Sequence, residues 1–282
     1  MTYEELWHRL TAVCEAGEAK AIARMVLDVR FGLSLTDIIS GKDTELSAND
    51  QTELEKIAQR LCEGEPVQYV LGVADFCGRQ FRVAPGVLIP RPETEELCRW
   101  ILEERGAWKE EREYSLLDIG TGSGCIAITL AAELPQARVA AWDISDDALR
   151  IAADNARRLQ VSVAFERHDI LSPTPSPLTP HLSIVVSNPP YILPSERQAM
   201  EKNVLDHEPA VALFVPKDDP IIYYRSIADY AMRSLKPGGQ LYFELNTLTA
   251  SSVGDYVLQA GFAQAEFHQD QFGRRRFLKA TK

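Results

Sequence analysis

Cysteine is scarce in this chain, and its spacing argues against a cross-linked framework. The 282 residues include five cysteines, an odd number, and no two of them stand at C-x-x-C spacing. Disulfide scaffolds and zinc sites use paired cysteines at short, regular spacings. We therefore expect no metal site, and free thiols in a reducing cytoplasm.

The chain also lacks segments that would direct it into or across a membrane. No stretch approaches the roughly 18 consecutive apolar residues of a transmembrane helix. The first residues, MTYEELWHRL, lack the basic start and apolar run of a signal peptide. These absences predict a cytoplasmic protein with no membrane partner.

An excess of positive charge is absent too. The chain has 30 Lys and Arg against 41 Asp and Glu, which gives a formal net charge of −11 at pH 7. Sequence-independent nucleic-acid binding depends on neutralising phosphates, so we expect no stable nucleic-acid partner. The composition, 45% hydrophobic and 25% charged, is instead typical of a globular chain with a buried core.

Residues 1–65 have helical patterns. Thr2 and Glu5 fit a capping box, in which each side chain bonds the other's backbone N–H, and Ser47 fits the N-cap of a later helix. Between them, an apolar stripe at helical spacing is formed by Ile22, Met25, Val26 and Val29. We find no titratable cluster and no glycine-rich loop in this segment. It therefore predicts a small helical domain that supports or recognises a substrate.

A stretch rich in turn-forming residues, 66–92, follows the helical region. Gly64-Glu65-Pro66 interrupts the helical pattern, and residues 67–89 are rich in Val, Phe, Leu and Gly, which predicts short strands or a hairpin. Residues 89–96, IPRPETEE, then combine two prolines, which stiffen a turn, with acids that suit the first turn of a helix. We interpret residues 66–92 as a hairpin or linker between two domains.

Residues 93–282 alternate between short apolar runs and amphipathic segments. The pattern predicts strands at 115–119, 138–142, 161–166, 184–187, 240–245, 262–267 and 275–280, and helices at 125–133, 145–159 and 221–235. Such alternation is typical of an α/β domain with a largely parallel, doubly wound sheet. Residues 172–180 contain four prolines, which predict an exposed loop.

A glycine loop follows the first of these strands. Asp118-Ile119-Gly120-Thr121-Gly122-Ser123-Gly124 opens a predicted helix, and glycines allow a sharp turn and close approach of a ligand to the amides. Asp143 ends the next strand, 23 residues after Gly120, where an acid can bind both hydroxyls of a ribose. Residues 122–127 also fit the G-x-G-x-x-A dinucleotide fingerprint. The loop by itself is therefore compatible with either an adenosyl or a nicotinamide cofactor.

A further acid follows the next strand, in Arg167-His168-Asp169-Ile170. In the S-adenosylmethionine version of such a sheet, this position faces the adenine. Asp169 is therefore a candidate hydrogen-bond partner of the base, and Ile170 a candidate cover for its face. His168 has no neighbouring nucleophile to activate, so we expect it to pack in the loop or lie at the surface.

The most informative stretch is Asn188-Pro189-Pro190-Tyr191, which directly follows the strand at 184–187. Neither proline has an N–H, so the backbone here loses donors and keeps acceptors. The Asn188 side-chain oxygen and the Pro189 carbonyl then suit a planar –NH2 group, and the Tyr191 ring can lie against its flat face. An amine held beside an adenosyl cofactor indicates N-methylation.

These motifs resemble those of the N5-glutamine methyltransferases that act on bacterial peptide chain release factors. The Asn-Pro-Pro-Tyr motif also occurs in DNA and RNA amino-methyltransferases, whereas the arginine–proline segment at 88–95 is more particular to this family. The resemblance implies a Rossmann-like class I S-adenosylmethionine methyltransferase domain at 93–282, preceded by a helical substrate-recognition domain at 1–65. The segments that carry it span most of the chain: 64–69, 88–95, 118–124, 188–192, 208–213, 236–239, and Gly273 with the basic residues after it.

The resemblance also implies roles for individual residues. The cofactor would be S-adenosylmethionine, converted to S-adenosylhomocysteine, and the substrate the Gly-Gly-Gln glutamine of class 1 release factors, which act in translation termination. Ile170 departs from relatives with tryptophan there, which weakens stacking on the adenine. The loop Gly120, Thr121, Gly122, Ser123 and Gly124 would cradle the methionine part and Asp143 would bind the ribose, while Asn188, Pro189, Pro190 and Tyr191 would hold the glutamine, with Asn188 also contacting the cofactor. We expect the enzyme to be a monomer.

Three alternatives stay open on the sequence alone. One is methylation of an exocyclic amine of a DNA or RNA base, which uses the same tetrapeptide but fits poorly with a net charge of −11. Another is a nicotinamide-dependent oxidoreductase, which rests only on the glycine loop and Asp143. The third is a non-catalytic cofactor-binding scaffold. It leaves the acceptors of the Asn188 side chain and the Pro189 carbonyl, the acceptor edge, without a function.

Overall fold

The computed structural model describes residues 1–104, 114–172 and 181–282, so most of the loop predicted at 172–180 lies outside the described residues. The chain divides into two compact units. The first comprises Met1–Val73 and Met200–His207, and the second comprises Ala74–Ala199 and Glu208–Lys282. Within the described ranges, no helix is long and apolar enough to span a bilayer.

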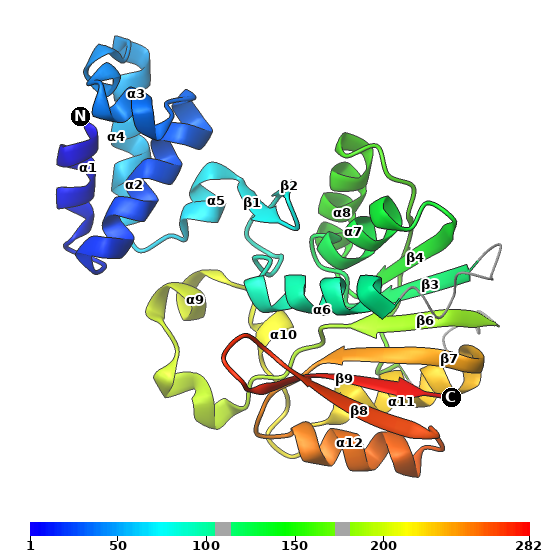
Figure 1. Cartoon of the computed structure of the whole chain (residues 1–282). Helices are drawn as coiled ribbons and strands as arrows, with labels where there is room; N and C mark the ends of the chain where they lie inside the picture. The colour runs from blue at the N-terminus through cyan, green and yellow to red at the C-terminus, as the bar shows by residue number, and fades with distance from the viewer. Residues whose placement is uncertain (105–113, 173–180) are drawn as a thin grey trace. The chain divides into compact units, whose positions relative to one another are not determined.

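The first unit is helical (Figure 1). The predicted capping box is confirmed: the Glu5 N–H donates to Thr2 Oγ1 at 3.3 Å, and the Thr2 N–H donates to Glu5 Oε2 at 2.8 Å. Ser47 also caps its helix, as predicted, by accepting from Asp50 N. The helical elements are α1 (Tyr3–Leu10), α2 (Ala16–Phe31), α3 (Leu35–Ile39), the 3-10 helix η1 (Lys42–Glu45), α4 (Ala48–Cys62), α5 (Val67–Leu71) and, from the later segment, α9 (Lys202–His207).

The buried face of α2 differs from the stripe predicted for it. Met25 and Val29 are exposed, whereas the fully buried residues are Ala19, Ala23, Val26 and Leu27. The prediction followed the large apolar side chains. The helix instead packs on the side where two alanines, four residues apart, allow neighbouring helices to approach closely.

The prediction of strands over residues 67–89 is wrong at its start. Val67–Leu71 form helix α5, and Val67 and Val70 share a face that packs into the helical core. This burial outweighs the β propensity of valine, which is a weak and context-dependent preference. Two short strands, β1 (Val73–Phe76) and β2 (Arg79–Arg82), then pair with each other.

Seven described strands form one sheet in the second unit, in the order β5-β4-β3-β6-β7-β9-β8. The strands β3 to β7 pair in parallel, and β9 runs antiparallel to both β7 and β8, which confirms the largely parallel, doubly wound sheet. The strands are β3 (Tyr114–Ile119), β4 (Ala137–Asp143), β5 (Ala164–Arg167), β6 (Leu182–Ser187), β7 (Leu235–Glu244), β8 (Gln264–Gln269) and β9 (Arg275–Thr281).

Helices cover both faces of this sheet (Figure 1). Alternate residues of a strand point to opposite faces, so Leu116 packs into a core with α6 and α7, and Leu117 into a core with α11 and α12. The helices of this unit are α6 (Pro92–Glu103), α7 (Cys125–Glu133), α8 (Asp146–Arg158), η3 (Pro194–Ala199), α10 (Ala210–Leu213), α11 (Ile222–Ser234) and α12 (Ala250–Gln259).

The order of the strands determines where a ligand can bind. The chain moves outward from β3 through β4 to β5 on one side, and from β6 to β7 on the other. Ligands of doubly wound sheets bind beyond the carboxyl ends of the strands at this reversal. Gly120, Asp143 and Asn188 lie at the carboxyl ends of β3, β4 and β6, so the fold brings them to the same edge.

Candidate functional site

The glycine loop after β3 has the backbone conformation that requires glycine. Gly120, Gly122 and Gly124 have φ angles of 77°, 55° and 82°, in the left-handed region that other residues adopt at a cost. A Cβ on Gly120 or Gly122 would meet nothing within 4 Å, whereas one on Gly124 would lie 2.8 Å from Ile128 Cδ1. The first two glycines therefore leave open space beside the backbone, and the third allows close packing.

The buried side chain of Asp118 orients this loop through hydrogen bonds. Its Oδ2 accepts from Thr121 Oγ1 at 2.6 Å and from the Ala127 N–H at 3.3 Å, and the side chain is fully buried. Burial raises the pKa of Asp118 to about 7. Asp118 thus ties the loop to the first turn of α7 and does not face a ligand.

Asp143 links the glycine loop to the next helix. Its Oδ2 accepts from the Gly122 N–H at 2.8 Å, and its Oδ1 accepts from the Ser145 N–H at 2.9 Å. Burial raises the pKa of Asp143, and these backbone hydrogen bonds oppose that effect. Each carboxylate oxygen keeps further lone pairs for a ligand, because a carboxylate offers about four acceptor sites.

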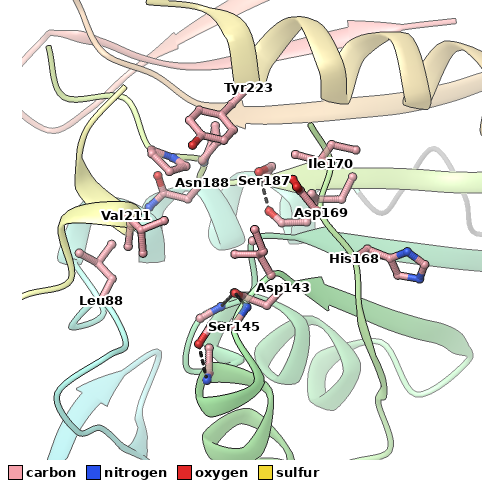
Figure 2. A pocket seen from close by; sticks show the side chains of 18 of the residues that line it. Leu88, Asp143, Ser145, His168, Asp169, Ile170, Ser187, Asn188, Val211 and Tyr223 are labelled. Atoms are coloured by element: carbon pink, nitrogen blue, oxygen red, sulfur yellow. Dashed lines mark hydrogen bonds between the residues drawn. The ribbon is translucent and has the colours of Figure 1, made fainter. Parts of the chain in front are cut away.

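A cavity lies at this edge of the sheet (Figure 2). Figure 2 shows Asn188 and Tyr223 above Asp143, with Asp169 and Ile170 to one side. The predicted site residues that line the cavity are Gly120, Gly122, Asp143, Asp169, Ile170, Asn188, Pro189 and Pro190. The structure therefore joins the glycine loop, the acids after β4 and β5, and the segment Asn188-Pro189-Pro190 after β6, here called the proline edge, in one site.

Four predicted site residues do not line the cavity. The side chains of the loop residues Thr121 and Ser123 are buried, and Gly124 packs against α8. The Tyr191 ring packs against the apolar core on the α11 side of the sheet, and its hydroxyl donates to Glu244 Oε1 at 3.1 Å. Tyr191 therefore lies behind the proline edge.

His168 lines the cavity, but its ring packs against Trp142 with centroids 4.1 Å apart, and its Nε2 lies 3.1 Å from Glu166 Oε2. This packing in the loop is the role expected from the sequence.

Behind the proline edge, Asn188 belongs to a buried hydrogen-bond network that sequence reasoning missed. Asn188 Nδ2 donates to Thr94 Oγ1 at 3.1 Å, and Thr94 Oγ1 donates to Glu244 Oε2 at 2.7 Å. Burial raises the pKa of Glu244, and the hydrogen bonds from Thr94 and Tyr191 lower it. Thr94 lies on α6 and Glu244 ends β7, so no local pattern could have connected them with Asn188.

Two further segments complete the walls of the cavity and were not predicted. They are residues 86–88 and residues 211–212. Between them, the buried carboxylate of Glu208 accepts from the Ile89 N–H at 3.2 Å and forms an ion pair with Arg91. This pair joins the two wall segments, because Ile89 and Arg91 follow the first and Glu208 precedes the second.

Other lining residues missed from the sequence include Tyr223 on α11 and Ser187 on β6. Burial raises the pKa of Tyr223, and so, more weakly, does the charge of Asp169. Ser187 Oγ donates to the Ile119 carbonyl at 2.6 Å and so ties the ends of β6 and β3 together. Both residues carry common side chains in ordinary helical and strand patterns, which gave no signal of a site.

The residues present fit an adenosyl cofactor. The backbone of Gly120 and Gly122 faces open space that a Cβ would fill, and Asp143 offers free lone pairs beside it. Asp169 and Ile170 supply an acceptor and an apolar surface further along the cavity. Among the described residues, we find no cluster of His, Cys, Asp and Glu that could hold a metal ion.

Comparison with known sequences identifies relatives that match almost the whole chain. Residues 5–72 match the PrmC N-terminal domain family, and residues 105–208 match the Methyltransferase small domain family. The chain is 47% identical to the release factor glutamine methyltransferase of Bacteroides thetaiotaomicron, over 94% of this chain and 93% of that protein. It is 37% identical to the corresponding protein of Flavobacterium psychrophilum, over 96% of this chain and 95% of that protein.

Solved structures support the fold at a greater distance. A T. thermophilus 16S rRNA methyltransferase, in complex with AdoMet and guanosine, is similar with a TM-score of 0.51 and 18% identity, over 74% of this chain and 49% of that chain. Identity at this level concerns the fold alone, whereas the sequence relatives extend over both units. The chain therefore belongs to the release factor glutamine methyltransferase family.

Proposed function

We propose that this protein transfers a methyl group from S-adenosylmethionine to the side-chain nitrogen of the glutamine in the Gly-Gly-Gln motif of bacterial class 1 release factors. One observation carries the proposal: a single cavity is lined by Gly120, Gly122 and Asp143 and also by the edge Asn188-Pro189-Pro190. The relatives named as release factor glutamine methyltransferases support the choice of substrate. We further propose that the enzyme acts as a monomer in the cytoplasm.

The cofactor would be held by residues at the carboxyl ends of β3, β4 and β5. The Gly120–Gly122 backbone would contact its methionine part, Asp143 would accept from its ribose hydroxyls, and Asp169 and Ile170 would meet its adenine. When bound, S-adenosylmethionine supplies an electrophilic methyl group on a sulfonium centre. S-adenosylhomocysteine is the product expected to leave this site.

The chain's own contribution to the reaction is to orient the glutamine amide. An amide nitrogen is a weak nucleophile because its lone pair is delocalised, so alignment matters; positioning of this kind contributes up to roughly 7–11 kcal/mol. Asn188 Oδ1 and the Pro189 carbonyl would accept the two amide hydrogens and hold the nitrogen in line with the methyl group. After transfer, the methylated amide can release its proton to water.

A methyl-transfer assay tests this proposal. Purified release factor and S-adenosylmethionine with a labelled methyl group are incubated with the enzyme, beside a release factor whose glutamine is replaced by alanine and beside duplex DNA. We expect label only in the release factor that keeps its glutamine. Label in the alanine form would refute the assigned target, and label in DNA alone would support base methylation instead. Calorimetry with NAD against S-adenosylmethionine tests the oxidoreductase alternative.

A further inference from the structure

The side chain of Asn188 can work as an acceptor only if its amide is turned the right way. A carboxamide has an oxygen that accepts and an –NH2 that donates, and a rotation of 180° exchanges the two. Asn188 lines the cavity, and its Oδ1 has no hydrogen-bond partner among the described residues. The orientation must therefore be set by what its nitrogen contacts.

The direction of the hydrogen bonds behind Asn188 determines that orientation. A carboxylate has no hydrogen to donate, so Glu244 Oε2 requires the Thr94 hydroxyl as its donor at 2.7 Å. Having used its hydrogen, Thr94 Oγ1 can only accept from Asn188, which it does from Nδ2 at 3.1 Å. The amide nitrogen of Asn188 is thus directed toward Thr94, and its oxygen remains for the cavity.

The anchor of this network is rigidly held. The Tyr191 hydroxyl donates to the other oxygen of Glu244 at 3.1 Å, and the Tyr224 hydroxyl donates to the Glu244 main-chain carbonyl at 2.9 Å. Thr94 is 3% exposed and Glu244 1% exposed, so water competes little for these bonds. Neither side chain lines the cavity, and Thr94 is hydrogen-bonded to Asn188, which does line it.

We propose that Thr94 and Glu244 are positioning residues that keep the Asn188 amide oxygen turned toward the substrate, an inference that rests on the proposed function of glutamine methylation. This orientation selects for glutamine over glutamate. An acceptor matches the –NH2 of glutamine, whereas a glutamate carboxylate would place two sets of lone pairs against each other. If the amide turned over, Asn188 would present hydrogens to the ligand and the preference would weaken or reverse.

Glu244→Gln and Thr94→Val are the test variants. The carboxamide introduced by Glu244→Gln would present either an oxygen or an –NH2 to Thr94, so the direction of the hydrogen bonds is no longer imposed. The substitution Thr94→Val keeps the shape of the threonine side chain without its hydroxyl, and Thr94→Ser keeps the hydroxyl. Thr129→Val is a matched control, since Thr129 on α7 is equally buried and its hydroxyl has no partner among the described residues.

Three quantities are measured for each variant. They are kcat for methylation of the release factor, the calorimetric dissociation constant for S-adenosylmethionine, and inhibition by a release factor whose Gly-Gly-Gln glutamine is replaced by glutamate. We expect Glu244→Gln and Thr94→Val to lower kcat by about ten- to a hundredfold and to strengthen inhibition by the glutamate form, with cofactor binding unchanged. Thr94→Ser and Thr129→Val should resemble the unmodified protein.

Some results would overturn the proposal. Unchanged kcat in both test variants would do so, as would a loss of cofactor binding in step with kcat, because that pattern indicates general damage. If Thr94→Val fails to fold, Glu244→Gln carries the test, since it removes a buried charge and keeps the shape of the side chain.

An NMR experiment tests the hydrogen-bond network independently of the proposed methylation activity. The Asn188 side-chain –NH2, followed by 15N NMR and assigned from its absence in Asn188→Ser, should exchange slowly with D2O in the unmodified protein and faster in Thr94→Val. If the unmodified protein fails to methylate release factor, the proposed function fails and this exchange still tests the network. Equal exchange in both proteins would overturn the network itself.

Discussion

Asp118 and Asp143 lie near the ends of neighbouring strands, yet their surroundings give them different roles. Asp118 is fully buried and bonds only to the chain around it, through Thr121 and Ala127. Asp143 lines the cavity and bonds backbone N–H groups on the loop and at the start of α8. At the residue scale, exposure to the cavity distinguishes the acid that is available to a ligand from the acid that bonds only within the chain.

The ligand role proposed for Asp143 predicts a loss of cofactor affinity on substitution. Asp143→Ala removes the acceptor for the ribose hydroxyls and also the bonds to Gly122 N and Ser145 N that shape the loop. We expect S-adenosylmethionine binding, measured by calorimetry, to weaken by about 1.5–3 kcal/mol. Circular dichroism and a thermal melt serve as the folding control. Unchanged affinity in a folded variant would remove Asp143 from the site.

The structural role of Asp118 predicts a pH dependence of stability. Burial raises its pKa from 3.8 to about 7, so between these values the folded state binds a proton that the unfolded state releases. The free energy of unfolding should therefore decrease as pH rises through this range. Urea unfolding at several pH values from 5 to 7 gives the unfolding free energy as a function of pH. In Asp118→Asn, this free energy should fall less with rising pH than in the unmodified protein, by up to about 1.4 kcal/mol per pH unit. Identical slopes in the two proteins would contradict the prediction.

At the scale of the element, the glycine loop combines two functions in one short segment. Gly124 lies at the N-terminus of α7, and a Cβ there would lie 3.0 Å from Ala152 Cβ on α8. Gly122 lines the cavity, and a Cβ there would meet no protein atom within 4 Å. The third glycine therefore serves helix packing, and the second leaves room for a ligand.

A pair of alanine variants separates these functions. Gly124→Ala combines a positive φ with a clash against backbone-anchored atoms, so we expect roughly 1–3 kcal/mol lower stability. Gly122→Ala adds a methyl group beside the cavity at a φ of 55°, so its main effect should be weaker S-adenosylmethionine binding. Thermal melts and calorimetry on both variants provide the measurement. An equal loss of stability in the two variants would contradict this division.

At the scale of the whole molecule, the cavity described above is lined only by residues of the second unit. The first unit has its own core of helices, built from residues such as Leu6, Ala23 and Leu54. Phe76 and Phe81 of the β1–β2 pair belong to the core of the second unit. A division of the chain at Val73–Ala74 therefore separates the two cores without cutting either.

This division predicts how a shortened protein behaves. A fragment starting at Ala74 keeps β1 except for its first residue, Val73, and keeps β2 and every residue that lines the cavity. We therefore expect it to bind S-adenosylmethionine by calorimetry. We expect it to methylate intact release factor poorly, because the helical unit is proposed to recognise that protein. Labelled methyl transfer to release factor is compared with that of the full chain. Equal transfer by the fragment would show that the helices are not needed for recognition.

Much of this protein could be predicted from sequence because the determining patterns are local. The alternation of strands and helices, the glycines after β3 and the capping box at Thr2 depend on residues a few positions apart, whose backbone preferences act within one turn or one strand. The acceptor edge at Asn188-Pro189-Pro190 is likewise a property of the residue types themselves. Because parallel strands share one carboxyl edge, these patterns also predicted that the loop, Asp143 and Asn188 would meet.

Only the tertiary structure decided which side chains from distant parts of the chain contact one another. Thr94, Asn188 and Glu244 come from three elements far apart in the chain, and their hydrogen bonds exist only because α6 packs beside the ends of β6 and β7. The face that α2 buries also depended on how closely its neighbours approach, which favoured small alanines over larger apolar side chains. The packing of a core depends on residues that are distant in the sequence, and a local pattern carries no information about such partners.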